Sequence, residues 1–141
     1  VGRDMREMSL SWAQSAGGAI SNARDTDRWV RAIFGGKVVP PKQQQEWMSL
    51  VSQKTGDPIA ELTADDSRGY ALGLGKALFG PLGPVWFYQG ETLGYRTLYA
   101  WFADEDLTIT VQTNSHPPDA ENKLSDAITA IHEIVAKPAA K

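Results

Sequence analysis

The clearest pattern in the chain is a pair of alternating segments, residues 95–102 and 107–114, joined by the acidic turn at 103–106. Alternation with a period of two predicts two β-strands paired as a hairpin. The register that sets apolar residues opposite one another pairs Phe102 with Leu107, Ala100 with Ile109 and Leu98 with Val111. The other face of the first strand carries Tyr99 and Trp101, so we expect a sheet that is covered on both sides.

Apolar residues recur at helical spacing in three other places. The first predicted helix begins after Asn22, which can cap it, and ends at Gly35-Gly36. The second begins at Pro41 and runs to about Val51. The third follows Pro117-Pro118-Asp119, and we expect it to pack on the aliphatic face of the hairpin. Its apolar positions are Leu124, Ala127, Ile128, Ile131, Ile134 and Val135.

Glycine and proline interrupt the region between the second helix and the hairpin. Residues 55–69 are polar and predict mostly loop, and residues 70–74 predict a strand broken by a glycine. Residues 80–84 predict a turn. Residues 85–88 predict a short buried strand, which we expect to end in a glycine turn at Gly90.

Composition limits the possible functions. A chain of 141 residues fits one domain, and 42% hydrophobic with 22% charged residues is ordinary for a globular protein. A net charge of -3, without a basic run, argues against a nucleic-acid partner. The apolar runs are far shorter than the ~20 residues that span a bilayer, so we expect no membrane span. The absence of cysteine excludes disulfides and a thiol nucleophile.

Three short motifs are better explained by structure than by chemistry. Lys54-Thr55-Gly56 lies in a predicted loop, followed by Asp57-Pro58. Gly73-Leu74-Gly75-Lys76 lacks both the earlier glycine and the Ser/Thr of a phosphate-binding loop. His116 and His132 are too isolated to predict a metal site, and no cofactor is expected.

Three further segments stand in a fixed order along the chain: AGGAIS at 16–21, GYALGLG at 69–75 and YQGETLGY at 88–95. They resemble, in that order, three segments of β-lactamase-like serine hydrolases. These are an Ala-Gly-Gly segment ending in Ser, a GYGLGW strand, and a Lys- or His-Thr-Gly strand. That group includes class C β-lactamases, D-alanyl-D-alanine carboxypeptidases and related esterases. With the hairpin and the last helix, the resemblance covers roughly residues 12–136.

The resemblance implies an α+β fold with an antiparallel sheet of at least three strands and flanking helices. It also implies that residues 1–141 form a single partial domain, the C-terminal segment of such a hydrolase. In that group a serine attacks a carbonyl, aided by a lysine three residues later. Carried over, Tyr88, Gln89 and Gly90 stand at the Lys/His-Thr-Gly positions and bind substrate. The backbone N–H of Glu91 then contributes to the oxyanion hole as the catalytic group.

Three departures from that pattern change what we expect. Ser-x-x-Lys occurs nowhere in the chain, which begins at Val1 in a polar stretch, so we expect a piece of a longer protein that is inactive alone. Tyr88 replaces a cation that binds a substrate carboxylate, and a phenol carries no positive charge near neutral pH. Gln89 also removes a hydroxyl. Both changes shift the expected substrate toward esters or other neutral acyl compounds, while β-lactams and peptides stay open.

The leading hypothesis is the C-terminal portion of a serine hydrolase that acts on amides or esters through an acyl-enzyme. It supplies the substrate-aligning strand and part of the oxyanion hole. Its expected partner is an N-terminal portion that bears Ser-x-x-Lys, or a second copy, because a sheet edge and an aromatic face would otherwise be uncovered. The alternative is a non-catalytic binding or assembly module on the same scaffold. The resemblance favours a periplasmic or secreted location, and a cytoplasmic one is compatible.

Overall fold

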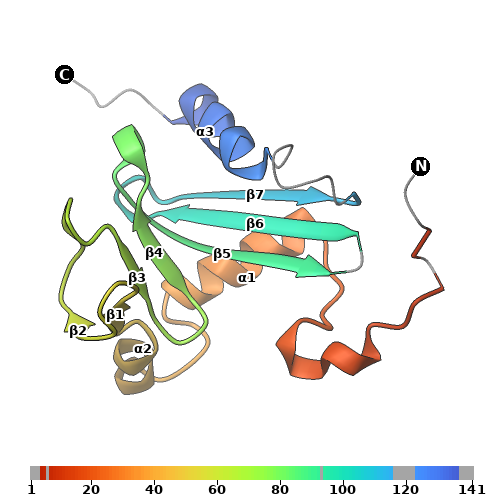
Figure 1. The fold of residues 1–141 in the computed structure, drawn as a ribbon, viewed down its shortest axis with the longest axis horizontal. Coiled ribbons are helices and arrows are strands. Elements are labelled where there is room, and N and C mark those ends of the chain that lie inside the picture. The colour runs from red at the N-terminus through yellow and green to blue at the C-terminus, as the bar shows by residue number, and fades with distance from the viewer. Residues whose placement is uncertain (1–3, 6, 93, 116–122, 137–141) are drawn as a thin grey trace.

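The computed structural model describes residues 4, 5, 7–92, 94–115 and 123–136. Within them, seven strands form one antiparallel sheet in the order β2-β1-β3-β4-β5-β6-β7 (Figure 1). The strands are β1 (Leu50–Ser52), β2 (Pro58–Ile59), β3 (Arg68–Tyr70), β4 (Gly75–Leu78), β5 (Pro84–Thr92), β6 (Tyr95–Phe102) and β7 (Leu107–Thr113). The three last strands are long and the others short. The predicted α+β class is confirmed.

Helices cover both faces of the long strands. The α-helices are α1 (Ala23–Phe34), α2 (Pro41–Trp47) and α3 (Leu124–Val135). Short 3-10 turns are η1 (Ser11–Ala16), η2 (Gly80–Leu82) and η3 (Ala103–Glu105). Figure 1 shows α3 and α1 on opposite sides of β6 and β7. In the part of the chain that the structure describes, no helix is both long and apolar enough to cross a membrane.

The predicted hairpin register is confirmed at all three positions: Phe102 faces Leu107, Ala100 faces Ile109 and Leu98 faces Val111. The third helix packs on this aliphatic face, as predicted. It begins at Leu124, and the predicted start at residues 117–119 lies outside the described residues. The buried core on this side consists of Val85, Leu98, Ala100, Phe102, Ile109, Leu124 and Ile128. Alternation in the strands and helical spacing in α3 therefore identify the same core.

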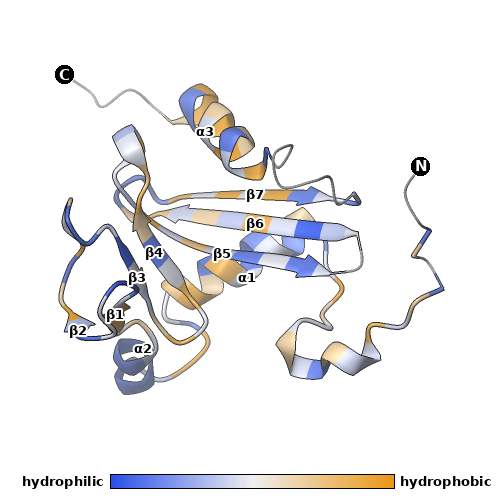
Figure 2. Ribbon diagram, viewed as in Figure 1, coloured by the Kyte–Doolittle hydropathy of each residue, from blue (hydrophilic) through white to orange (hydrophobic). Residues whose placement is uncertain are grey.

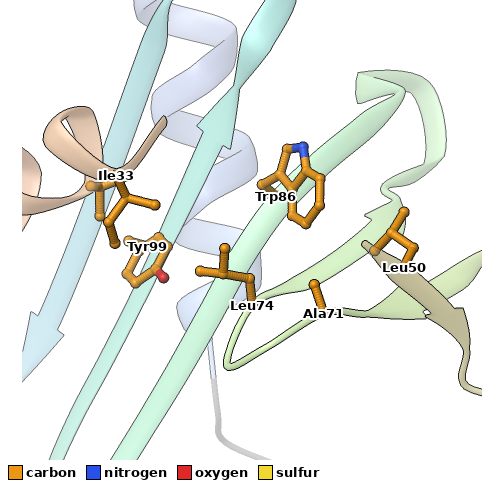
Figure 3. Packing of buried hydrophobic residues seen from close by; sticks show 7 residues of the cluster. Ile33, Leu50, Ala71, Leu74, Trp86 and Tyr99 are labelled. Atoms are coloured by element: carbon orange, nitrogen blue, oxygen red, sulfur yellow. The ribbon is translucent and has the colours of Figure 1, made fainter. Parts of the chain in front are cut away.

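The opposite face holds a second core, built largely by α1 and the aromatic strand residues (Figure 3). Phe34 stacks on Trp101 with ring centroids 5.6 Å apart, and Val30 and Ile33 are buried beside Tyr99, which is 8% exposed. The expectation of an uncovered aromatic face is therefore wrong over Tyr99 and Trp101. α1, which belongs to this chain, covers that part itself.

α1 begins and ends where the sequence predicts. The Asn22 side chain accepts a hydrogen bond from the Asp25 backbone N–H at 3.0 Å, which satisfies one N–H of the first turn. The chain leaves the helix through Gly35 and Gly36, and Gly36 takes a φ of 65°. That left-handed conformation is readily available to glycine.

The second helix is shorter than predicted. It ends at Trp47, and Leu50 enters strand β1 and is 7% exposed in the core. The Trp47 indole Nε1 donates a hydrogen bond to the Leu72 carbonyl oxygen at 2.6 Å, which ties the helix end to the β3–β4 turn. α2 has no buried residue and is mostly hydrophilic in Figure 2, so burial of Leu50 in the sheet outweighs continuation of the helix.

The glycine-rich middle of the chain also differs from the prediction. Residues 70–74 are not a strand: β3 ends at Tyr70, and the Ala71 N–H donates to the Leu74 carbonyl oxygen at 2.7 Å across a turn. Gly73 supplies a φ of 75° there. The predicted loop at 55–69 contains β2 and the first residues of β3. The expected turn at Gly90 is also wrong, because β5 continues through it to Thr92.

Candidate functional site

β5 is paired differently along its length. Its first part, from Pro84 to Phe87, lies between β4 and β6. Its second part, from Tyr88 to Thr92, has β6 as its one strand neighbour among the described residues, because β4 begins at Gly75 opposite Phe87. The predicted site residues all lie in this second part.

The hairpin geometry decides which way the backbone of this second part points. Two residues separate the paired Thr92 and Tyr95, and in such a hairpin the closing pair exchanges hydrogen bonds. Bonded and non-bonded pairs alternate along an antiparallel ladder. The pairs Glu91–Arg96 and Gln89–Leu98 are therefore non-bonded pairs. The N–H and C=O groups of Gln89 and Glu91 thus point away from β6, toward the side that β4 leaves open.

Tyr88 lies in a group of three phenols. It pairs with Tyr99 across β5 and β6, and it is 40% exposed, whereas Tyr99 is buried. Burial raises the pKa of Tyr70, and a hydrogen bond to Tyr88 raises it further. Burial, followed by the nearby Tyr88 and Tyr70, raises the pKa of Tyr99 well above its ordinary value. The position expected to carry a cation in similar hydrolases is therefore surrounded by neutral hydroxyl groups.

Gln89 lies on the opposite face of the sheet from Tyr88, because neighbouring strand residues alternate. It lines a cavity of about 120 Å³ between β5, β6 and α3, whose walls include Phe87, Leu98 and Ile128. The backbone groups of Gln89 therefore point to the open edge of β5, whereas its side chain lies on the sheet face opposite to Tyr88.

Gly90 has open space beside it. A Cβ atom added at Gly90 would meet no atom within 4 Å. Gly75, by contrast, is packed against Phe87, whose ring would lie 2.8 Å from such an atom. Packing within the described residues therefore accounts for the glycine at 75 but gives no reason for the one at 90.

Glu91 is held by an ion pair to the neighbouring strand. Its carboxylate oxygen Oε2 lies 2.8 Å from Nε of Arg96, the residue opposite it in the β5–β6 register. The Arg96 side chain is 2% exposed and that of Glu91 is 32% exposed. A buried charge is tolerated where it is paired, so this contact restrains the end of β5.

Of the predicted site residues, the structure places Tyr88, Gly90 and the Glu91 backbone along one open stretch of strand. Sequence reasoning did not single out Tyr70 or Arg96. The Arg96 contact follows from the hairpin: with a two-residue loop, residues 91 and 96 must face one another, and they carry opposite charges. Tyr70 had no such signal, since its contact with Tyr88 joins strands that are not neighbours.

The other polar candidates have structural roles. His132 Nε2 lies 2.9 Å from both carboxylate oxygens of Glu105, and its ring packs on Phe102 at 4.4 Å, which ties α3 to the β6–β7 turn. Lys54-Thr55-Gly56 forms the turn between β1 and β2. Among the residues that the structure describes, no group of three or more His, Asp or Glu residues could hold a metal ion.

Comparison with known families identifies the family of this chain. A family model described as Beta-lactamase matches residues 2–133, a span that includes α1, the whole sheet and most of α3. The match covers far more than half of the 141 residues and agrees with the antiparallel sheet and its flanking helices. This chain therefore belongs to the Beta-lactamase family and has a serine-hydrolase-like scaffold.

Proposed function

We propose that this chain is the C-terminal portion of a serine hydrolase that cleaves amides or esters through an acyl-enzyme. The observation that carries the proposal is the second part of β5. From Tyr88 to Thr92 it pairs with β6 alone among the described strands, and the N–H groups of Gln89 and Glu91 point to its other side. A strand in this state can align an extended acyl substrate by backbone hydrogen bonds.

The reaction divides between this chain and the polypeptide that carries Ser-x-x-Lys. The serine oxygen attacks the substrate carbonyl carbon. Its proton passes to the lysine amine, and the electrons of the carbonyl double bond move onto the carbonyl oxygen. The N–H of Glu91 donates a hydrogen bond to that oxyanion. The tetrahedral intermediate then collapses. The leaving amine or alcohol departs with the proton that serine gave up, and an ester remains on the serine. Water then attacks this ester, releases the acid and returns the proton to serine.

Tyr88 forms the wall of the acyl pocket in this proposal. Its hydroxyl lies in a group with that of Tyr70 and with the buried Tyr99. A phenol donates one hydrogen bond to an ester or amide oxygen but gives no full charge to a carboxylate. The favoured substrates are therefore small esters or neutral acyl compounds.

A fluorophosphonate probe tests the proposal, because it reacts with activated serines. Intact-mass spectrometry is run on the chain alone and on the chain co-expressed with the polypeptide bearing Ser-x-x-Lys. We expect an adduct on that second polypeptide, ester turnover by the pair, and neither with the chain alone. Steady turnover by the pure 141-residue chain contradicts the proposal. A pair that assembles but carries no adduct contradicts it too, and favours the binding or assembly module.

A further inference from the structure

The proposed oxyanion donor stands where the sheet gives least support. β4 does not extend to Glu91. Within the described part of the chain, its strand pairing therefore comes from the β5–β6 hairpin. The Glu91–Arg96 pair is a non-bonded pair of this hairpin, so the two residues exchange no backbone hydrogen bonds with each other. A side-chain contact between these two residues therefore contributes more to fixing the backbone than it would at a hydrogen-bonded pair.

Arg96 provides such a contact. Its Nε lies 2.8 Å from the Glu91 carboxylate, and its side chain is 2% exposed, so the guanidinium has little freedom to move. The contact lies on the α3 face, with Leu98 two residues further along β6, whereas Tyr88 lies on the other face. It therefore restrains the strand without occupying the substrate side.

The ion pair also controls charge. The Glu91 carboxylate belongs to the same residue as the N–H that would receive the oxyanion. An unpaired carboxylate there would oppose a developing negative charge, and the effect is strong where water is excluded. Arg96 offsets it from a buried position.

We propose that Arg96 is a positioning residue of the hydrolase: through Glu91 it holds the oxyanion-donating N–H in place and cancels the carboxylate charge beside it. This inference rests on the proposed function for its kinetic consequence. Its structural part, order at the Glu91 amide, stands independently of turnover.

The test is a double-mutant cycle in the assembled pair, with Arg96→Met, Glu91→Gln and the two combined. Arg96→Met should lower kcat about 10–100-fold, the scale of a misplaced catalytic group, and change KM less than about threefold. The double variant should recover part of that loss, because it removes the uncompensated carboxylate but does not restore the restraint on the backbone. Arg28→Met is the matched control, since Arg28 pairs with Asp25 at 3.1 Å on the exposed surface of α1.

Amide hydrogen exchange at Gly90 and Thr92, which flank Glu91 and whose N–H groups face β6, is measured by NMR in the same samples and separates the structural claim from the kinetic one. Arg96→Met should speed exchange at Gly90 and Thr92 at least about tenfold and leave Trp86, which is paired on both sides, unchanged. Arg96→Lys keeps the positive charge and should show an intermediate exchange rate. It replaces Arg96→Met in the experiment if that variant does not fold. Unchanged exchange at Gly90 and Thr92, or a double variant as slow as Arg96→Met, overturns the inference. A wild-type pair without adduct or turnover overturns the proposed function alone, and the exchange result still decides whether Arg96 orders Glu91.

Discussion

The two parts of β5 differ in almost every physical respect although they belong to one strand. Val85 and Trp86 are buried, 2% and 7% exposed, and pair with β4 on one side and β6 on the other. Tyr88 is 40% exposed, Gly90 has open space beside it, and both pair with β6 alone among the described strands. We therefore expect folding stability to rest on the first part and, in the proposed function, substrate alignment on the second.

The largest expected effect is in the first part. Trp86→Ala removes a buried ring that packs against Phe34 with centroids 5.7 Å apart, and it should lower the free energy of unfolding by about 3–5 kcal/mol. Tyr88→Ala, two residues on but half exposed, should cost less than about 1.5 kcal/mol. Urea unfolding followed by circular dichroism measures both. Equal losses would break the division between the two parts.

The next effect is kinetic and lies in the second part. Gly90→Ala should leave the free energy of unfolding within about 0.5 kcal/mol, because its Cβ meets nothing within 4 Å. It should lower kcat/KM of the assembled pair about 100-fold, because the methyl group takes space beside the aligned substrate. Ester hydrolysis and thermal unfolding are measured on one preparation. Full activity in this variant would place the substrate elsewhere.

Gly75→Ala offers the opposite result from the same chemical change. The added Cβ would lie 2.8 and 2.9 Å from two ring atoms of Phe87, in the part of the sheet that is paired on both sides. We expect a loss of about 1–3 kcal/mol from overpacking. Combining it with Phe87→Leu should recover part of the loss. If the double variant is no more stable than Gly75→Ala, the ring contact is not the cause.

The smallest effect is a dependence on alkaline pH. The pKa of Tyr99 is raised in the folded chain by burial first and by Tyr88 and Tyr70 next. Below pH ~10 the phenol is neutral in both folded and unfolded states, so the shift has no effect. Above that pH the unfolded phenol ionises first, and stability falls by at most about 1.4 kcal/mol per pH unit.

Tyr99→Phe should flatten that fall, and urea unfolding between pH 9 and 11 measures it. Tyr95→Phe is the control, because Tyr95 is 51% exposed and lies at the far end of the same strand. A slope that is the same in Tyr99→Phe and in the wild type would show that Tyr99 does not cause the alkaline loss.

The sequence predicted the hairpin, its register and the existence of both helices that cover it, because period-two and period-3.6 patterns are local. It did not predict that α1 covers the aromatic face, which depends on tertiary packing. Its errors lie at glycines, because a glycine can form a turn, continue a strand or make room for a neighbouring side chain. Gly73 and Gly75 lie close together, yet Gly73 makes a turn and Gly75 accommodates a ring. Gly90 resembled a turn but continues a strand, since Thr97 pairs with it. These distinctions depend on contacts between strands that single-sequence patterns do not contain.

The candidate site shows the same limit. Tyr88, Gly90 and Glu91 could be proposed from the order of segments along the chain. The opposite orientation of Gln89 follows from strand alternation once Gly90 is known to continue β5. Tyr70 could not be found, because its meeting with Tyr88 requires the whole β3–β4–β5 arrangement.

Among the described strands, β5 pairs on one side only beyond Phe87, and this bears on how such a protein can change over evolutionary time. Because Tyr88 is 40% exposed and Gly90 has open space beside it, substitutions at these positions are expected to meet weak selection for stability. In the proposed function, a Tyr-Gln pair that stands in place of Lys-Thr is the kind of change that this freedom permits. New substrate preferences could therefore arise within a single strand while the sheet beside it stays the same.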